Sequence, residues 1–362
     1  MIWIGGPWWD ACWILSGLPI GIVATVLVLS GVPYFGLLAF GVIVFQTAHT
    51  ISPICLAWSH VAFRQIMLAR PMKFMVVPLA ILVIWTIAGY VGGLFWPQPI
   101  FNPVTLKIAI TTYWQPLGLM GTIYGIWNIY HFGKQNFGVM SIYRRKYEQH
   151  AMNSQPRYSG SSRLACFLSQ RRFDLIFCCT TAWAVMAVPY VHMTANYLRI
   201  EALQFYNVLA AYIAVAGIFA AVMLWREWQA SRFCLGRIVL ILANATAMAS
   251  AMLWGLGGLG IISMNHWLVA IGLAGRASRR TVDFPIAIIV IGAVLFWALF
   301  VRGWAIPTQV AAAAVAFRLA LGIVHFLYDR WIWKFTDPQV RATIGCDLFH
   351  RPADQQNRQH IS

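Results

Sequence analysis

Residues 74–96 read FMVVPLAILVIWTIAGYVGGLFW, a run without one charged side chain. A helix of about 20 apolar residues is long enough to cross the hydrocarbon core of a bilayer, which is roughly 30 Å thick. Backbone groups inside that core find no water, so a segment that spans it must satisfy its own hydrogen bonds as a helix. The run therefore predicts a transmembrane helix.

Similar apolar runs recur along the whole chain. They lie at roughly 11–30, 33–59, 74–96, 104–131, 173–194, 203–224, 237–255, 258–275, 284–304 and 309–333. The seventh and eighth are separated by a glycine cluster after Trp254, because glycine interrupts helices. The segment 104–131 has a second interpretation, in which a helix begins near Pro116 and runs to about Tyr143. We therefore expect an all-α, polytopic transmembrane bundle of about ten spans.

The overall composition agrees with a protein embedded in lipid. Of 362 residues, 60% are hydrophobic and only 10% are charged, and the mean hydropathy is +0.69. Soluble domains carry about 25% charged residues. A net charge of +16 would suggest nucleic acid in a soluble protein. Here the basic residues fit membrane topology instead, so we expect the lipid bilayer and its anionic head groups as partners, and no nucleic acid.

The positions of the basic residues orient the predicted spans. Of the 26 Lys and Arg residues, 22 fall in five alternate connections, at 60–73, 132–172, 225–237, 276–283 and 330–362. Basic connections face the cytoplasm, so both termini are expected there, in what we interpret as a bacterial inner (plasma) membrane.

This orientation also suggests a domain organisation. Residues 1–335 are expected to form one transmembrane domain, in which 132–172 is a basic cytoplasmic loop. Residues 336–362 are expected to form a polar cytoplasmic tail.

Four histidines are predicted to lie at a similar depth. His49, His266 and His325 stand 9 to 11 residues from the inner ends of their spans, which corresponds to roughly 14–17 Å, and His131 stands about 20 Å from its own inner end. Ionisable residues inside a membrane are costly and usually face the bundle interior or a cavity. The spacing therefore predicts several imidazoles in one layer of the cytoplasmic half.

Polar residues accompany these histidines at helical spacing. Asn128 and Gln135 flank His131 at i−3 and i+4, while Arg318 and Asp329 lie on the same predicted face as His325. Metal-bound imidazoles commonly donate their second N–H to such neighbours. Gln135 and Asn128 are therefore candidates for supporting a cofactor, Asp329 is the best carboxylate candidate, and Asp329 and Arg318 are the candidate catalytic residues. Arg318 is a candidate anion or substrate contact, with a structural ion pair as its alternative.

Imidazole is a ligand that suits iron, copper, zinc and nickel. We interpret His49, His131, His266 and His325 as metal ligands, with His60 as a spare ligand. Three alternatives stay open. Each histidine could be a buried residue with one hydrogen bond, the set could form a proton or substrate path, or pairs on facing helices could bind haem.

Four short patches resemble a known family. They are Thr47-Ala48-His49, His131-Phe132-Gly133, Asn265-His266-Trp267 and Val324-His325-Phe326-Leu327-Tyr328-Asp329. Their order resembles the Brp/Blh family of membrane β-carotene dioxygenases. The glycines that surround the family's first histidine are missing here, and Ala270 stands four residues after His266, where the family has a histidine pair. The resemblance implies a buried, all-histidine iron site that is reached from the lipid.

Together these observations predict an integral membrane, metal-dependent oxidoreductase or oxygenase. Its metal would be non-haem iron, and its substrate a lipophilic small molecule. A polytopic transporter or permease for a small solute is one alternative, although such proteins contain internal repeats and the two halves of this sequence show no convincing repeat. A haem-binding electron carrier is the other alternative.

Overall fold

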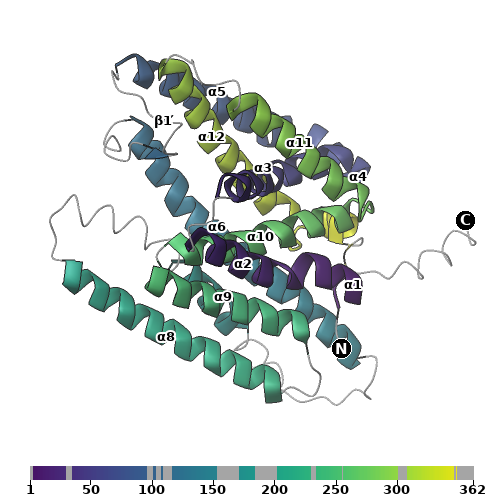
Figure 1. Cartoon of the computed structure of the whole chain (residues 1–362). Helices are drawn as coiled ribbons and strands as arrows, with labels where there is room; N and C mark the ends of the chain where they lie inside the picture. Colours follow the sequence, from purple (N-terminus) through teal and green to yellow (C-terminus); the bar gives the residue numbers. More distant parts are fainter. Residues whose placement is uncertain are drawn as a thin grey trace, which may run out of the picture. The chain divides into compact units, whose positions relative to one another are not determined.

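The structure is all-helical apart from one very short strand pair (Figure 1). The computed structural model describes residues 3–29, 35–95, 101–102, 107–108, 116–152, 171–183, 202–229, 234–254, 256–300, 308–345 and 348. Strand β1 (Phe101–Asn102) pairs with β2 (Lys107–Ile108) in antiparallel fashion, with Phe101 opposite Ile108. The predicted all-α class is therefore confirmed.

The described helices follow the predicted apolar runs closely. In chain order they are α1 (Pro7–Asp10), η1 (Ala11–Leu15), α2 (Gly17–Leu29), α3 (Phe35–Ser59), α4 (Val61–Leu68), η2 (Met72–Val76), α5 (Val77–Leu94), α6 (Pro116–Met152), residues 171–183, α8 (Ala202–Gln229), α9 (Leu235–Trp254), α10 (Leu256–Ala277), α11 (Asp283–Phe300), α12 (Thr308–Ile332), α13 (Pro338–Val340) and η5 (Arg341–Gly345). The α9 and α10 helices are separate, as the glycine cluster predicted.

Helix α6 corrects two expectations. The segment 104–131 is not one helix, because β2 lies inside it and α6 begins at Pro116, as the second interpretation held. Proline suits the first turn of a helix, where its missing N–H would have no partner anyway. The helix then continues to Met152, so the first half of the segment 132–172 is helical and not a loop. The final stretch of α6 contains no glycine or proline that would end it earlier.

Three described helices are long and apolar enough to cross a membrane. They are Met72–Leu94, Ala210–Trp228 and Gln309–Ile332, and the shorter apolar helices are Leu235–Ala249 and Asp283–Val294. On α5, Leu79 is 61% exposed and Ile84 is 63% exposed. Large exposed apolar surfaces of this kind mark contact with lipid or protein. These findings indicate a membrane protein, while ten spans and the orientation of the termini stay predictions.

The chain divides into two compact units. Unit 1 comprises Met1–Val42 and Ile129–Gly272, and unit 2 comprises Ile43–Asn128 and Leu273–Ser362. Helices α3, α6 and α10 contribute residues to both units. The expectation of one transmembrane domain over residues 1–335 stays a prediction.

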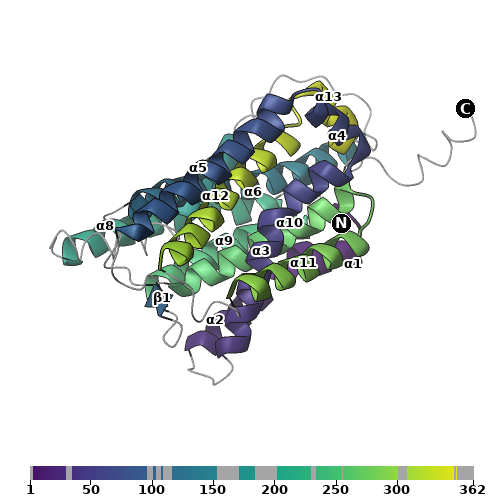
Figure 2. The same ribbon diagram turned by 90° about the horizontal axis from the view of Figure 1, so that it is seen from above.

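In unit 2, α5 and α12 lie side by side as an antiparallel pair (Figure 2). Near one end, a Cβ added to Gly93 would lie 2.5 Å from the Cα of Gln309, so the two backbones approach closely. Near the other end, the Tyr328 hydroxyl donates to the Phe74 carbonyl at 2.6 Å. Small residues allow this approach in membrane helices, where van der Waals packing drives association.

The beginning of the predicted polar tail also packs in unit 2. Asp337 caps α13 by accepting a hydrogen bond from the Gln339 N–H, and η5 contacts α4. Val340, Ile344 and Leu348 are buried. The four-residue spacing of Val340 and Ile344 places both on one face of the α13–η5 segment, which explains why this part does not behave as a polar tail. Residues 349–362 lie outside the described part of the chain.

In unit 1, α6 is tied to the beginning of the chain. The buried Asp10 carboxylate accepts hydrogen bonds from the Ile4 N–H at 2.9 Å, the Gly5 N–H at 2.8 Å and the Tyr143 hydroxyl at 2.6 Å. The Lys146 ammonium donates to the Ile4 carbonyl at 2.7 Å. These contacts join α1 and the residues before it to the polar end of α6, so this segment packs against the rest of unit 1.

Candidate metal centre

Unit 2 brings His49 and His325 together. His49 lies on α3 and His325 on α12, both are buried, and their ring centroids are 4.3 Å apart at an interplanar angle of 69°. Pro53, inside α3, has no N–H for the His49 carbonyl, and the Ser52 hydroxyl donates to that carbonyl at 2.9 Å instead. The local sequence of α3 therefore supports an altered turn directly beside the histidine.

The two ring nitrogens of His325 have different surroundings. Its Nδ1 lies 3.1 Å from the Thr50 carbonyl oxygen, which can only accept a hydrogen bond. We therefore assign the ring proton of neutral His325 to Nδ1, so that Nε2 carries a lone pair. This Nε2 lies 3.5 Å from Oδ2 of Asp329, one turn further along α12. A lone pair and a carboxylate oxygen thus face each other in a buried place.

Asp329 is held from its other side. Its Oδ1 accepts a hydrogen bond from the Trp333 indole N–H at 3.0 Å, and the side chain is buried. This contact directs Oδ2 rather than Oδ1 toward His325. The predicted helical stripe from His325 to Asp329 is therefore a real contact.

These distances fit ligands of one shared ion. Metal–nitrogen and metal–oxygen bonds of about 2.1 Å, meeting at roughly 90–110°, place two ligand atoms about 3.0–3.5 Å apart. The same bonds place the centres of two neighbouring imidazole rings about 4.5–5 Å apart. The observed 3.5 Å between Nε2 and Oδ2 and 4.3 Å between the rings lie close to these values.

Unit 1 contains a second pair, His131 of α6 and His266 of α10. Both are buried, and their ring centroids are 5.1 Å apart at 87°. Phe132 stacks on His266 with a centroid distance of 3.8 Å, and Gln135 stands one helical turn after His131 on α6. The four histidines predicted as equals therefore form one close pair inside each unit.

The geometry of both pairs disfavours haem. Two imidazoles on opposite faces of a haem are separated by the iron and by two bonds of about 2 Å, so their ring centres lie roughly 6 Å apart. The observed separations of 4.3 Å and 5.1 Å are shorter than this. Two ligands on the same side of one ion describe both pairs better.

The remaining predicted residues have other surroundings. His60 is the N-cap of α4, where its Nδ1 accepts a hydrogen bond from the Phe63 N–H at 3.2 Å. The residue predicted as a spare metal ligand therefore caps a helix. Asn128 and Arg318 are half-buried on α6 and α12. Their predicted roles as cofactor support and substrate contact stay predictions.

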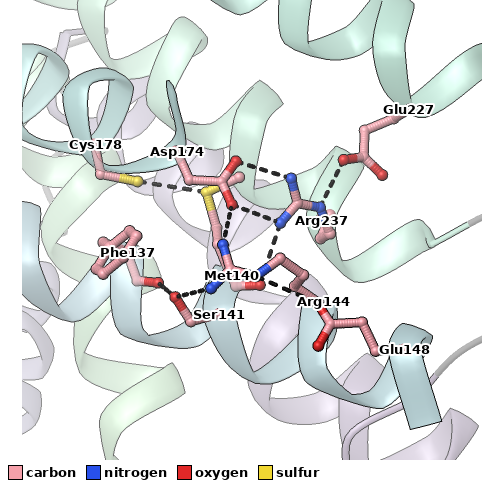
Figure 3. A network of polar contacts seen from close by, with 9 residues as sticks. All are labelled: Phe137, Met140, Ser141, Arg144, Glu148, Asp174, Cys178, Glu227 and Arg237. Carbon is pink, nitrogen blue, oxygen red and sulfur yellow. Dashed lines mark hydrogen bonds and ion pairs between the residues drawn. The ribbon is translucent and has the colours of Figure 1, made fainter. Parts of the chain in front are cut away.

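Unit 1 also contains a buried ionic network that sequence reasoning missed (Figure 3). Arg237 of α9 binds Asp174 through two nitrogens, at 2.9 Å and 3.0 Å, and its Nε donates to Glu227 of α8 at 2.6 Å. Such forked contacts are among the stronger hydrogen bonds in proteins. Arg144 of α6 lies 3.4 Å from Asp174. The network thereby joins four helical segments of unit 1.

Charge compensation distinguishes this network from the histidine pairs. Burial lowers the pKa of Arg144, while the nearby carboxylates of Asp174 and Glu148 oppose that effect. Arg237 also donates to the Met140 carbonyl at 3.2 Å. One feature of the sequence could have indicated the network. The chain has only ten acidic residues, so each of them could have been expected to pair with a basic residue.

Comparisons with protein-family models, curated proteins and solved structures give no match for this chain. The resemblance to the Brp/Blh family therefore stays a prediction.

Proposed function

We propose that this protein is an integral membrane, metal-dependent oxidoreductase, with a metal ion held in unit 2 by His325, Asp329 and His49. One observation carries the proposal. The Thr50 carbonyl binds Nδ1 of His325, so that its Nε2 lone pair faces Oδ2 of Asp329 at 3.5 Å. Backbone carbonyls commonly bind the second nitrogen of metal-bound imidazoles in this way.

The donor set supports non-haem iron. Two imidazoles and one carboxylate are typical of iron(II) oxygenases, because they leave coordination positions open. Iron bound in this way would supply O2 binding and activation. The His131–His266 pair of unit 1 is proposed as a further set of imidazole ligands.

The protein's own residues would position and shield the ion. Trp333 fixes the orientation of the Asp329 carboxylate, and Thr50 fixes the tautomer of His325. Because the side chains of all three proposed ligands are buried, bulk water is kept from the site. We propose a lipophilic substrate that enters from the bilayer, with Arg318 contacting its polar end, in a ten-span protein of the bacterial inner membrane with cytoplasmic termini.

Elemental analysis of the detergent-purified full chain tests this proposal. The parent is expected to hold stoichiometric iron, and His325→Ala and Asp329→Asn are expected to lose most of it. His60→Ala is the matched control, because it removes an imidazole that caps α4 and should leave the metal content unchanged. His131→Ala reports separately on the pair in unit 1.

Two results would contradict the proposal. One is a parent protein without appreciable metal, which would make the transporter alternative the leading hypothesis. The other is a His325→Ala variant that keeps the parent's metal content. Visible absorption of the same samples distinguishes haem from non-haem iron, since haem absorbs strongly in the visible range.

A further inference from the structure

An open groove lies in unit 2 between α4 and the α13–η5 segment. Its volume is about 580 Å³. Its lining combines apolar and polar side chains, among them Ile66, Ala69, Ala342, Arg70, Gln339 and Thr343. An amphipathic lining of this kind fits a ligand with an apolar part and a polar or charged part.

The groove lies at one end of the α5–α12 pair. The candidate span Met72–Leu94 begins two residues after Arg70, and the candidate span Gln309–Ile332 ends five residues before Asp337. Because α5 and α12 run antiparallel, these two ends lie together, close to α4 and α13 (Figure 2). In the orientation predicted from the basic residues, this end is cytoplasmic. The groove would then lie at the depth of the inner-leaflet head groups.

The charge around the groove is positive. Lys73 interacts electrostatically with Arg70, Arg330, Lys334 and Asp337, a set of four cations and one carboxylate with a net charge of +3. Asp337 does not neutralise this set. Its Oδ1 caps α13, and its Oδ2 lies 3.9 Å from Arg70, which is 45% exposed. The set therefore complements an anion.

Aromatic residues mark the same level as a membrane interface. The Lys73 ammonium lies 4.7 Å from the centroid of Phe74 and 5.0 Å from that of Trp331. Tryptophan and lysine concentrate at the boundary between hydrocarbon and head groups. On α4, Val61 and Leu68 are exposed, as expected for a short helix that lies in the interface.

We propose that this groove binds the head group of an acidic phospholipid, with the phosphate at Arg70 and the glycerol and upper acyl chain along Ile66, Ala69 and Ala342. The apolar part of the lining and the two adjoining spans favour a lipid over free phosphate. The site is separate from the proposed metal site, and it does not depend on the proposed oxidoreductase function.

Native mass spectrometry of the full chain in mild detergent can test this site. The protein is titrated with phosphatidylglycerol and, separately, with phosphatidylcholine. The parent is expected to retain phosphatidylglycerol preferentially, and Arg70→Gln is expected to weaken that binding about fivefold, the effect of one basic residue near an anionic surface. Arg64→Gln is the matched control, because Arg64 is an exposed cation on the same helix outside the groove lining.

A second variant tests the groove without changing its charge. Ala342→Trp fills the space between α4 and η5 and should reduce lipid retention as much as Arg70→Gln does. Metal content should stay at the parent's level in both variants, which separates this test from that of the proposed function.

Four outcomes would overturn the proposal. One is equal retention by Arg70→Gln and Arg64→Gln, and another is equal binding of the two lipids by the parent. The third is displacement of phosphatidylglycerol by inorganic phosphate at low millimolar concentration, which would identify a site for free phosphate. The fourth is normal lipid retention by a folded Ala342→Trp variant, which would show that the lipid binds outside this groove.

Discussion

Two of the buried polar clusters in the described part of this protein differ in how their charges are balanced. In unit 1, the Arg237 guanidinium makes short contacts with two carboxylates, at 2.6–3.0 Å. In unit 2, a histidine lone pair and a carboxylate oxygen face each other at 3.5 Å. The first cluster contains residues of both charge signs, whereas His49, His325 and Asp329 in the second offer imidazole nitrogens and a carboxylate but no permanent cation.

This difference separates a structural cluster from a binding cluster. A buried ion pair with satisfied hydrogen bonds needs no further partner, and removing one member leaves an uncompensated charge. A group of acceptors gains stability when a cation joins it. We therefore expect substitutions in unit 1 to affect mainly folding, and substitutions around His325 to affect mainly metal binding.

The largest effect is expected for Arg237→Met. This change leaves Asp174 and Glu227 buried without their main cation and should lower the free energy of unfolding by about 3–5 kcal/mol. Thermal unfolding of the detergent-solubilised protein measures it. Arg172→Met, which removes an exposed cation near Asp174, should change stability by less than about 0.5 kcal/mol. Similar losses in both variants would mean that the network does not have the structural role assigned to it.

Added iron should stabilise the parent protein through unit 2. At a free iron(II) concentration of about 100 times the dissociation constant, the expected gain is about 2.7 kcal/mol. Anaerobic thermal unfolding with and without iron measures the gain. Asp329→Asn should show little of it, because the carboxylate ligand is lost. An equal gain in stability in the variant would show that Asp329 is not a ligand of the iron.

A smaller effect is expected at the neutral cluster of unit 1. Asn244 Oδ1 accepts hydrogen bonds from Asn136 and Thr181, each at 3.1 Å. Asn244→Leu leaves the buried amide of Asn136 unsatisfied and should cost about 1–3 kcal/mol. The double variant Asn136→Leu, Asn244→Leu should recover much of that loss in the same unfolding assay. A double variant that is less stable than the single one would show that the loss does not come from the unsatisfied amide of Asn136.

The smallest effect on stability is expected for Trp333→Phe. It removes one hydrogen bond to Asp329 and should cost about 1 kcal/mol when a chelator is present. Iron affinity should fall about 10- to 100-fold, as is usual when a partner of a metal ligand is lost. Calorimetric titration with iron measures that affinity. An unchanged affinity would indicate that Trp333 does not orient the carboxylate.

Sequence reasoning predicted the helices better than the contacts. Hydrophobic runs predicted α5, α8 and α12 within a few residues, because lipid requires long apolar segments. The start of α6 was ambiguous because apolar residues continue across the strand pair before Pro116. The packed residues of α13 and η5 were missed because Val340 and Ile344 stand among polar neighbours.

At the candidate site, too, the contacts between helices could not be predicted from the sequence. Counting residues along a helix gives the depth of each histidine, but depth is one coordinate and does not tell which helices are neighbours. The contact between His325 and Asp329 followed from i,i+4 spacing. The pairing of His325 with His49 and the contact with the Thr50 carbonyl depend on how α3 packs on α12, which spacing does not contain.

The link between Asp10 and Tyr143 has a consequence for the order of biosynthesis. Asp10 leaves the ribosome 133 residues before the hydroxyl that completes its hydrogen bonds. The segment that contains Asp10 must therefore remain without this hydrogen bond until α6 has been translated. A ribosome-bound chain that ends before Tyr143 should leave residues 4–10 open to protease, and a longer one whose α6 has fully left the ribosome should protect them.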